Sequence, residues 1–103
     1  MSNSKIEIES VHIKKEIKIH SQDASPQSEN DHGHIYALAL SGSTQLYVQD
    51  SNGNETKISP HNQQGEWEYF CRNQKTGKCI KINMEKMIKR LEEITGEKFI
   101  EEF

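Results

Sequence analysis

The sequence predicts a mainly β protein of the α+β class, built from short antiparallel hairpins with an N-terminal strand arm and one C-terminal amphipathic helix. Three observations support this prediction. Apolar and polar residues alternate over much of the chain, turn-forming residues separate the alternating runs, and the apolar period lengthens after Asn83. These changes divide the chain into a strand arm with a polar linker (1–31), a β-hairpin module (32–82), and a helix with its tail (83–103).

The composition leaves little margin for a self-sufficient core. Hydrophobic residues make up 32% of the 103 residues. Leu, Ile, Val and Phe together account for 21 of the 103, a share close to the roughly 20% below which chains tend to stay disordered. The net charge of −3 is small, so self-repulsion is weak. We therefore expect a folded protein that gains further burial by associating with itself or with a larger assembly.

The charges and the hydropathy argue against two classes of partner. Thirteen Lys and Arg are offset by sixteen Asp and Glu, so the chain lacks the basic surface that nucleic acid requires. No apolar run is long enough to span a membrane, and the polar first ten residues do not have the pattern of a signal peptide. We expect synthesis in the cytoplasm, with neither nucleic acid nor membrane as a partner.

The N-terminal arm is predicted from two phases of alternation with a bulge or tight turn near Glu9 and Ser10. The apolar positions are Ile6 and Ile8 in one phase, and Val11, Ile13, Ile17 and Ile19 in the other. Ser21–Asp31 is polar, contains Pro26 and has no periodicity. It is therefore either an ordinary surface loop or a hinge to an assembly arm.

Two hairpins are predicted in the module. His34–Leu40 is apolar in both phases, which favours a central strand. A turn follows the strand Gln45–Gln49, and within it Asn52 and Gly53 tolerate the positive φ angles of tight hairpins. In the second hairpin, Gly77 is expected to take the left-handed position of a three-residue loop.

The second hairpin also carries both cysteines. A three-residue loop would pair Asn73 with Cys79 and place Cys71 diagonal to Cys79 on one face, roughly 7–8 Å away. That separation is too long for a relaxed disulfide, so reduced thiols are expected. The aromatic residues Trp67, Tyr69 and Phe70 are expected mainly in the core rather than on a stacking platform.

The last segment has helical periodicity. Asn83 is placed to cap the first turn, and Gly96 to end the helix. One apolar stripe covers about a third of the helix surface, enough to dock on a sheet or on copies of itself. The predicted oligomer interface is this stripe: Met84, Met87, Ile88, Leu91 and Ile94.

The candidates for chemistry are few. His32 and His34 alternate on an extended segment, so their imidazoles point the same way, and a threefold assembly would bring six of them together around a metal such as iron or nickel. The alternative is that both histidines simply face water. No nucleophile elbow, phosphate-binding loop, dinucleotide loop or zinc-protease motif is present. We predict no catalytic residues, no cofactor and no enzymatic activity.

The run GHIYALALSGSTQLYVQDSNGNETKISPHN resembles a hairpin module of structural proteins from tailed phages and large aquatic DNA viruses, and INMEKMIKRLEEITGEKFIEEF is similar to the C-terminal tail of such proteins. The resemblance covers residues 33–103. It implies a non-enzymatic virion protein: a short fibre-, capsid- or tail-associated adaptor or decoration subunit. The partners it implies are further copies of the chain, with a trimer favoured, and other virion proteins. The alternative is a small intracellular phage-encoded protein that binds or inhibits a host protein.

Overall fold

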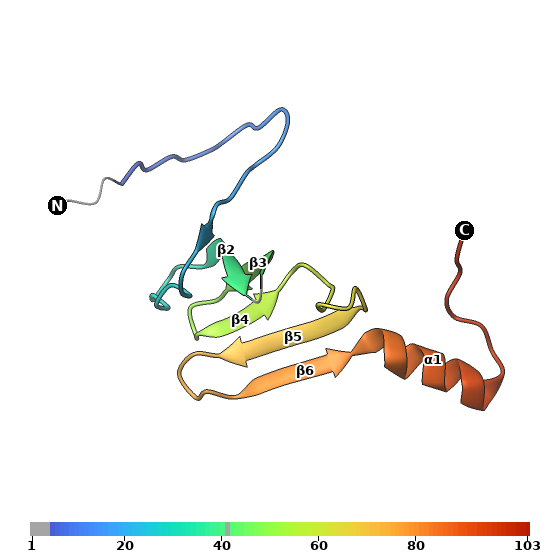
Figure 1. Cartoon of the computed structure of the whole chain (residues 1–103). Helices are drawn as coiled ribbons and strands as arrows, with labels where there is room; N and C mark the ends of the chain where they lie inside the picture. The colour runs from blue at the N-terminus through green and yellow to red at the C-terminus, as the bar shows by residue number, and fades with distance from the viewer. Residues whose placement is uncertain (1–4, 41) are drawn as a thin grey trace.

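A computed structural model describes residues 5–40 and 42–103 and shows one six-stranded sheet followed by one helix (Figure 1). The strands are β1 (Ser21–Gln22), β2 (His34–Leu40), β3 (Ser43–Gln49), β4 (Asn54–Lys57), β5 (Glu68–Asn73) and β6 (Cys79–Asn83), and the helix is α1 (Met84–Thr95). The strand order in the sheet is the order in the chain. β1 pairs with β2 in parallel, and every later pair is antiparallel. The predicted fold class is confirmed.

Alternation along the strands gives the sheet two different faces. The tyrosine face carries Tyr36, Tyr47 and Phe70 together with polar and charged side chains. The isoleucine face is the opposite one, and register places Ile35 against Val48, Thr56 against Cys71, and Tyr69 against Ile82. Its other large apolar members are Leu46, Ile58 and Ile80.

The buried core lies on the tyrosine face and is small. The rings of Tyr36 and Tyr47 stack at 5.8 Å between centroids, and Phe70 meets Tyr47 edge-on at 6.4 Å. Leu38 completes the cluster. Phe70 therefore packs against the core as expected, whereas Tyr69, on the other face, is 42% exposed.

β2 has the predicted bounds but not the predicted central place. It is the second strand of the sheet, and β1 covers it only opposite Ala37 and Leu38. Tyr36 is buried, but Ile35 on the other face is 67% exposed. An apolar second face predicts a covering layer, and within the described residues that layer is absent.

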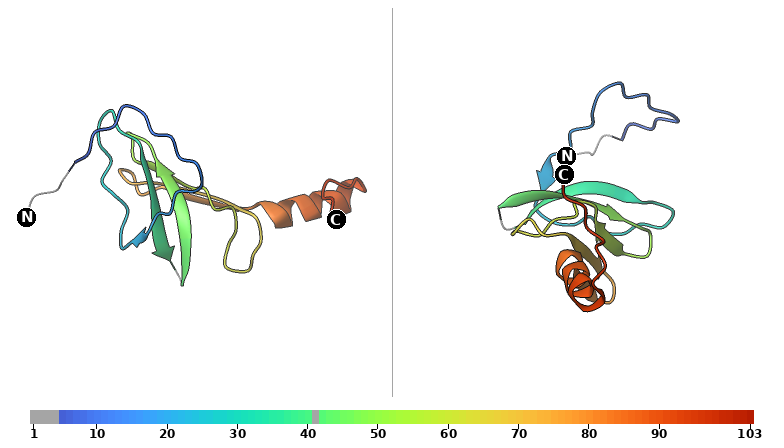
Figure 2. Two further views of the ribbon diagram at one scale, coloured as in Figure 1. Left: turned by 90° about the horizontal axis from the view of Figure 1, so that it is seen from above. Right: turned by 90° about the vertical axis from the view of Figure 1, so that its right-hand side faces the viewer.

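The strand arm differs from the prediction. Residues 1–4 lie outside the described part, and residues 5–20 form no strand. They extend away from the sheet (Figures 1 and 2), and Ile6, Ile8, Val11, Ile13 and Ile17 are all exposed. The physical reason is that alternation makes a segment suitable for pairing, but a strand forms only where a partner edge is present.

The polar linker, in contrast, is well anchored. Its first two residues form β1, and the backbone around Pro26 lies against the tyrosine face. The Pro26 carbonyl accepts hydrogen bonds from the side chains of Gln49 and Gln74, both at 2.9 Å. Ser28 donates its backbone N–H to Gln74 at 3.0 Å. Residues 21–22 are therefore paired within the sheet, and the following residues up to Ser28 are held against it by hydrogen bonds.

The second hairpin has a register shifted by one residue from the prediction. Asn73 exchanges hydrogen bonds with Lys78 and Gly77, which gives a four-residue loop, and Cys79 pairs with Arg72. An odd shift moves a side chain to the other face. Cys71 therefore lies on the isoleucine face and Cys79 on the tyrosine face, not on one face as predicted. Both are free thiols.

The helix has the predicted ends. Asn83 accepts the Lys86 N–H through its side chain, and Gly96 ends the helix at φ 75°. The helix continues from the end of β6 and projects beyond the sheet rather than lying on it (Figure 2). It is too short and too polar to cross a membrane, and the described residues contain no other helix.

Candidate functional site

A buried acid lies at the centre of the polar network on the tyrosine face. The side chain of Glu55 comes from β4, is 1% exposed, and accepts a hydrogen bond from the Tyr36 hydroxyl. Arg72, on the neighbouring strand β5, donates to the other oxygen of Glu55 at 3.3 Å and to the Ser25 hydroxyl at 3.2 Å. The linker thus closes the network over the sheet.

This arrangement shifts two titrations in opposite directions. Burial alone would raise the pKa of Glu55, but hydrogen bonds from Ser25 and Tyr36 and the Arg72 charge outweigh burial and lower it. Burial, the hydrogen bond to Glu55 and the charge of Glu55 raise the pKa of Tyr36 well above its ordinary value. The network therefore holds an ionised carboxylate beside a neutral phenol.

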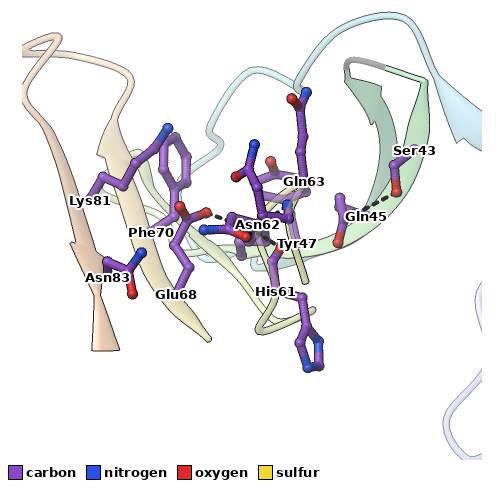
Figure 3. Close-up of a pocket in the computed structure, with 12 residues that line it drawn as sticks. Ser43, Gln45, Tyr47, His61, Asn62, Gln63, Glu68, Phe70, Lys81 and Asn83 are labelled. Carbon is purple, nitrogen blue, oxygen red and sulfur yellow. Dashed lines mark hydrogen bonds and ion pairs between the residues drawn. The ribbon is translucent and has the colours of Figure 1, made fainter. Parts of the chain in front are cut away.

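A second ion pair contributes to the lining of a hollow on the same face, which Figure 3 shows with Glu68 of this pair labelled. Lys57 and Glu68 meet at 2.7 Å, with both side chains only 7% exposed, and Lys57 also donates to the His61 carbonyl at 2.7 Å. The hollow has a volume of about 540 Å³, and its wall includes the ring of Phe70 and the amides of Gln45, Asn62 and Asn83.

The groups in this hollow are largely engaged with each other. Gln45 donates to the Ser43 hydroxyl at 2.7 Å, and Asn62 and Asn83 both donate to Glu66 at 3.2 and 3.1 Å. The Lys57 amine is engaged by the Glu68 carboxylate and by the His61 carbonyl. The arrangement is suited to holding the loop 61–66 against the sheet.

The two histidines predicted as metal ligands meet a carboxylate. Glu29 Oε2 lies 3.8 Å from His32 Nδ1 and 3.7 Å from His34 Nε2. His34 also meets the Gln49 side chain at 2.8 Å, and His32 meets the Asn30 carbonyl at 2.8 Å. Within one copy, the described residues contain no group of three or more His, Cys, Asp or Glu side chains that could hold a metal. A site shared between copies stays a prediction.

The predicted oligomer interface is not covered within one copy. Met87, Leu91 and Ile94 are 53%, 46% and 68% exposed, and Met84 and Ile88 are half-buried. No residue of α1 is buried. The stripe exists as predicted, and its partner stays a prediction.

The predicted turn residues hold the two hairpin ends together. Gly53 has φ 85° and is buried, and its carbonyl accepts the Gln74 N–H at 2.8 Å. The Asn52 carbonyl accepts a hydrogen bond from the side chain of Asn73 at 3.3 Å. Gly77 takes the expected positive φ of 75°. Of the Asn52–Gly53 pair, only the glycine has positive φ.

Sequence reasoning missed Glu55 and the isoleucine face. Glu55 occupies a polar turn sequence, and its burial is explained by partners on other strands, Tyr36 on β2 and Arg72 on β5. The apolar phase was visible in each strand separately. The pairing register of the strands, which the sequence does not give, brings these apolar residues together on one face.

Comparison with known proteins identifies no relative. No family model, no curated protein and no solved structure matches the chain.

Proposed function

We propose that this protein is a non-enzymatic structural subunit that assembles with copies of itself. The observation that carries the proposal is the balance of apolar exposure. Among the described residues, three large hydrophobic side chains and Ala37 are buried, whereas seventeen large ones are exposed. A soluble monomer rarely exposes a contiguous apolar patch of more than a few hundred Å² unless the patch is a binding surface.

The shape of the chain supports this proposal. The radius of gyration is 17.5 Å, whereas a compact domain of this length has one of about 13 Å. The excess comes from the arm and from α1, which both extend from the sheet (Figure 1). Elements that extend from a small core and carry apolar residues are suited to contacts between chains.

The arm is proposed to pair with a neighbouring copy. Its apolar residues alternate, and β6 is an edge strand of the sheet with one paired side. An extended segment can add to such an edge through main-chain hydrogen bonds. The sequence predicts a strand in the arm, but residues 5–20 form none within one copy. Pairing with a neighbouring copy would form it.

A helix variant tests self-association. Leu91→Glu combined with Ile94→Glu places two charges in the exposed stripe, and Glu93→Lys is the control because Glu93 lies on the opposite side of the helix. Light scattering should give a smaller mass for the double variant than for the control. Equal masses for both, together with unchanged circular dichroism, would remove the stripe from the interface.

The virion setting of the proposal rests on the resemblance of residues 33–103 described above. Mass spectrometry of purified particles from the encoding virus tests it. Stoichiometric recovery of this chain from the particles supports a fibre-, capsid- or tail-associated subunit. Its absence from particles, combined with one stoichiometric host protein in a pull-down from lysate, supports the host-binding alternative instead.

A further inference from the structure

The isoleucine face is an apolar surface that extends over five strands. From β2 to β6, its large side chains include Ile35 at 67%, Val48 at 37% and Ile82 at 38% exposure. Leu46, Ile58, Tyr69 and Ile80 lie between 38% and 49%. The other described strand positions on this face are Ala, Thr, Asn or Cys, and none of them is charged. An antiparallel sheet that faces water on one side normally has polar residues there.

The helix of the same chain cannot cover this face. The last residue of β6 is Asn83, and α1 begins at the next residue, Met84. Connections between a strand and the helix that packs back on its sheet usually contain 2–6 residues. Here the junction is fixed further, because Met84 donates its N–H to the Trp67 carbonyl at 2.9 Å and Asn83 caps the first turn.

One chain therefore contains an apolar sheet face and an apolar helix stripe that do not meet. We infer that α1 of one copy lies on the isoleucine face of a neighbouring copy. The inference rests on the self-association proposed above, and it adds which surface receives the helix. Such contacts can form a closed dimer, in which each helix lies on the other copy, or a closed ring, in which each helix lies on the next copy.

The dimensions of the two surfaces agree. A helix of twelve residues is about 18 Å long at 1.5 Å per residue. Five strands spaced about 4.8 Å apart give a face about 19 Å across. The helix can therefore cover the face from β2 to β6, and neither surface extends far beyond the other.

The area also agrees with a stable interface. A fully buried large aliphatic side chain removes about 60–120 Å² of apolar surface from water. Seven side chains on the face and three on the stripe, each about half exposed, would remove roughly 450 Å² per copy. In the closed dimer one interface buries both surfaces of each copy, and if about 60% of that interface is apolar, the total approaches the roughly 800 Å² per partner of a standard interface. A ring divides this area between two smaller interfaces.

The cysteines allow a direct test, because Cys71 lies on the isoleucine face and Cys79 does not. One chain carries Cys79→Ser and keeps Cys71. A second, longer-tagged chain carries Cys71→Ser, Cys79→Ser and Leu91→Cys. The two are refolded together and oxidised. We expect a disulfide-linked product at the summed mass, which requires contact between the stripe of one chain and the face of another.

The matched control replaces Leu91→Cys by Glu93→Cys, whose side chain lies on the polar side of α1 and is 66% exposed. The mixed product should be lost. A second reporter, Ile82→Cys in a chain with Cys71→Ser and Cys79→Ser, repeats the test from β6 in case Cys71 reacts slowly. Circular dichroism confirms that each variant folds.

The outcomes separate this inference from the proposed function. Oligomers that give only Leu91→Cys to Leu91→Cys products, and no product with either sheet reporter, overturn the helix-on-sheet contact but keep self-association. A mixed product of equal yield with Glu93→Cys shows random collision and also overturns the contact. A chain that is monomeric at every concentration overturns both proposals.

Discussion

The Tyr36 hydroxyl donates a hydrogen bond to Glu55, and the two residues lie on strands separated by β3. The carboxylate that accepts this bond is 1% exposed and has Arg72 as its ionic partner. A buried charge is stable only where hydrogen bonds and an opposite charge replace water. The folded sheet therefore depends on this contact as well as on its small apolar core.

Tyr36→Phe should lower the free energy of unfolding by about 1–3 kcal/mol, because it removes a hydrogen bond from a buried carboxylate. Urea unfolding followed by circular dichroism measures the change. Tyr47→Phe is the matched control: its ring stacks on Tyr36, but its hydroxyl is not hydrogen-bonded to Glu55. Equal losses from both variants would mean that the Glu55 contact contributes nothing specific.

The same pair predicts the pH dependence of stability. The pKa of Glu55 is lower in the folded protein than its ordinary value of 4.5, so its contribution is present above that value and is lost as the pH falls through the folded pKa. The pKa of Tyr36 is raised above its ordinary value of 10.0, so its contribution is present below pH 10.0 and is lost at higher pH. Unfolding midpoints at about pH 3, 7 and 11 should be highest near pH 7. Tyr36→Phe should weaken the alkaline loss, and an unchanged alkaline loss would exclude Tyr36 as its source.

Gly53→Ala should destabilise the protein more than Gly77→Ala. Both glycines have positive φ, 85° and 75°, so each alanine has a backbone cost of about 1–2 kcal/mol. Gly53 is buried, its carbonyl accepts the Gln74 N–H, and an added Cβ would be in van der Waals contact at 3.4 Å with Gln74 and Lys75, so the strained backbone there has little room to relax. Nothing lies within 4 Å of the corresponding position at Gly77, where the backbone can adjust. Thermal unfolding of the two variants measures the difference. The same melting temperature for both would show that the two hairpin ends are not tightly packed.

Two truncations distinguish the role of the arm in assembly from the role of the linker in stability. Deletion of residues 1–20 should reduce the mass of the assembly and leave the sheet with the melting temperature that the full chain shows when it is dissociated at low concentration. Deletion of residues 1–31 should also destabilise the sheet by about 2–4 kcal/mol, because it removes four hydrogen bonds made by Ser25, Pro26 and Ser28. Light scattering and thermal unfolding measure both quantities. An unchanged mass after removal of residues 1–20 would exclude the arm from assembly.

The sequence predicted the elements that depend on local chemistry. Asn83 and Gly96 define the ends of α1 through capping and a left-handed residue, and the apolar run at His34–Leu40 defines β2. Each of these patterns depends only on residues that are close in the sequence, so it can be recognised without knowing which distant segment the element contacts.

One failure concerns the length of a turn, and the others involve contacts with a distant segment. The loop before Cys79 has one more residue than predicted, and this reversed the face of Cys79 relative to Cys71. The burial of Glu55 depends on Arg72, seventeen residues away, and on the linker at Ser25. The alternation in residues 5–19 indicated a strand but could not indicate where its partner edge lies.

Sedimentation equilibrium of the unmodified chain across a wide range of concentrations tests the central claim most directly. The exposed helix stripe and isoleucine face predict folded oligomers, with masses that are multiples of 11.9 kDa and a melting temperature that rises with concentration. A folded species of 11.9 kDa at every concentration, with a constant melting temperature, would contradict self-assembly.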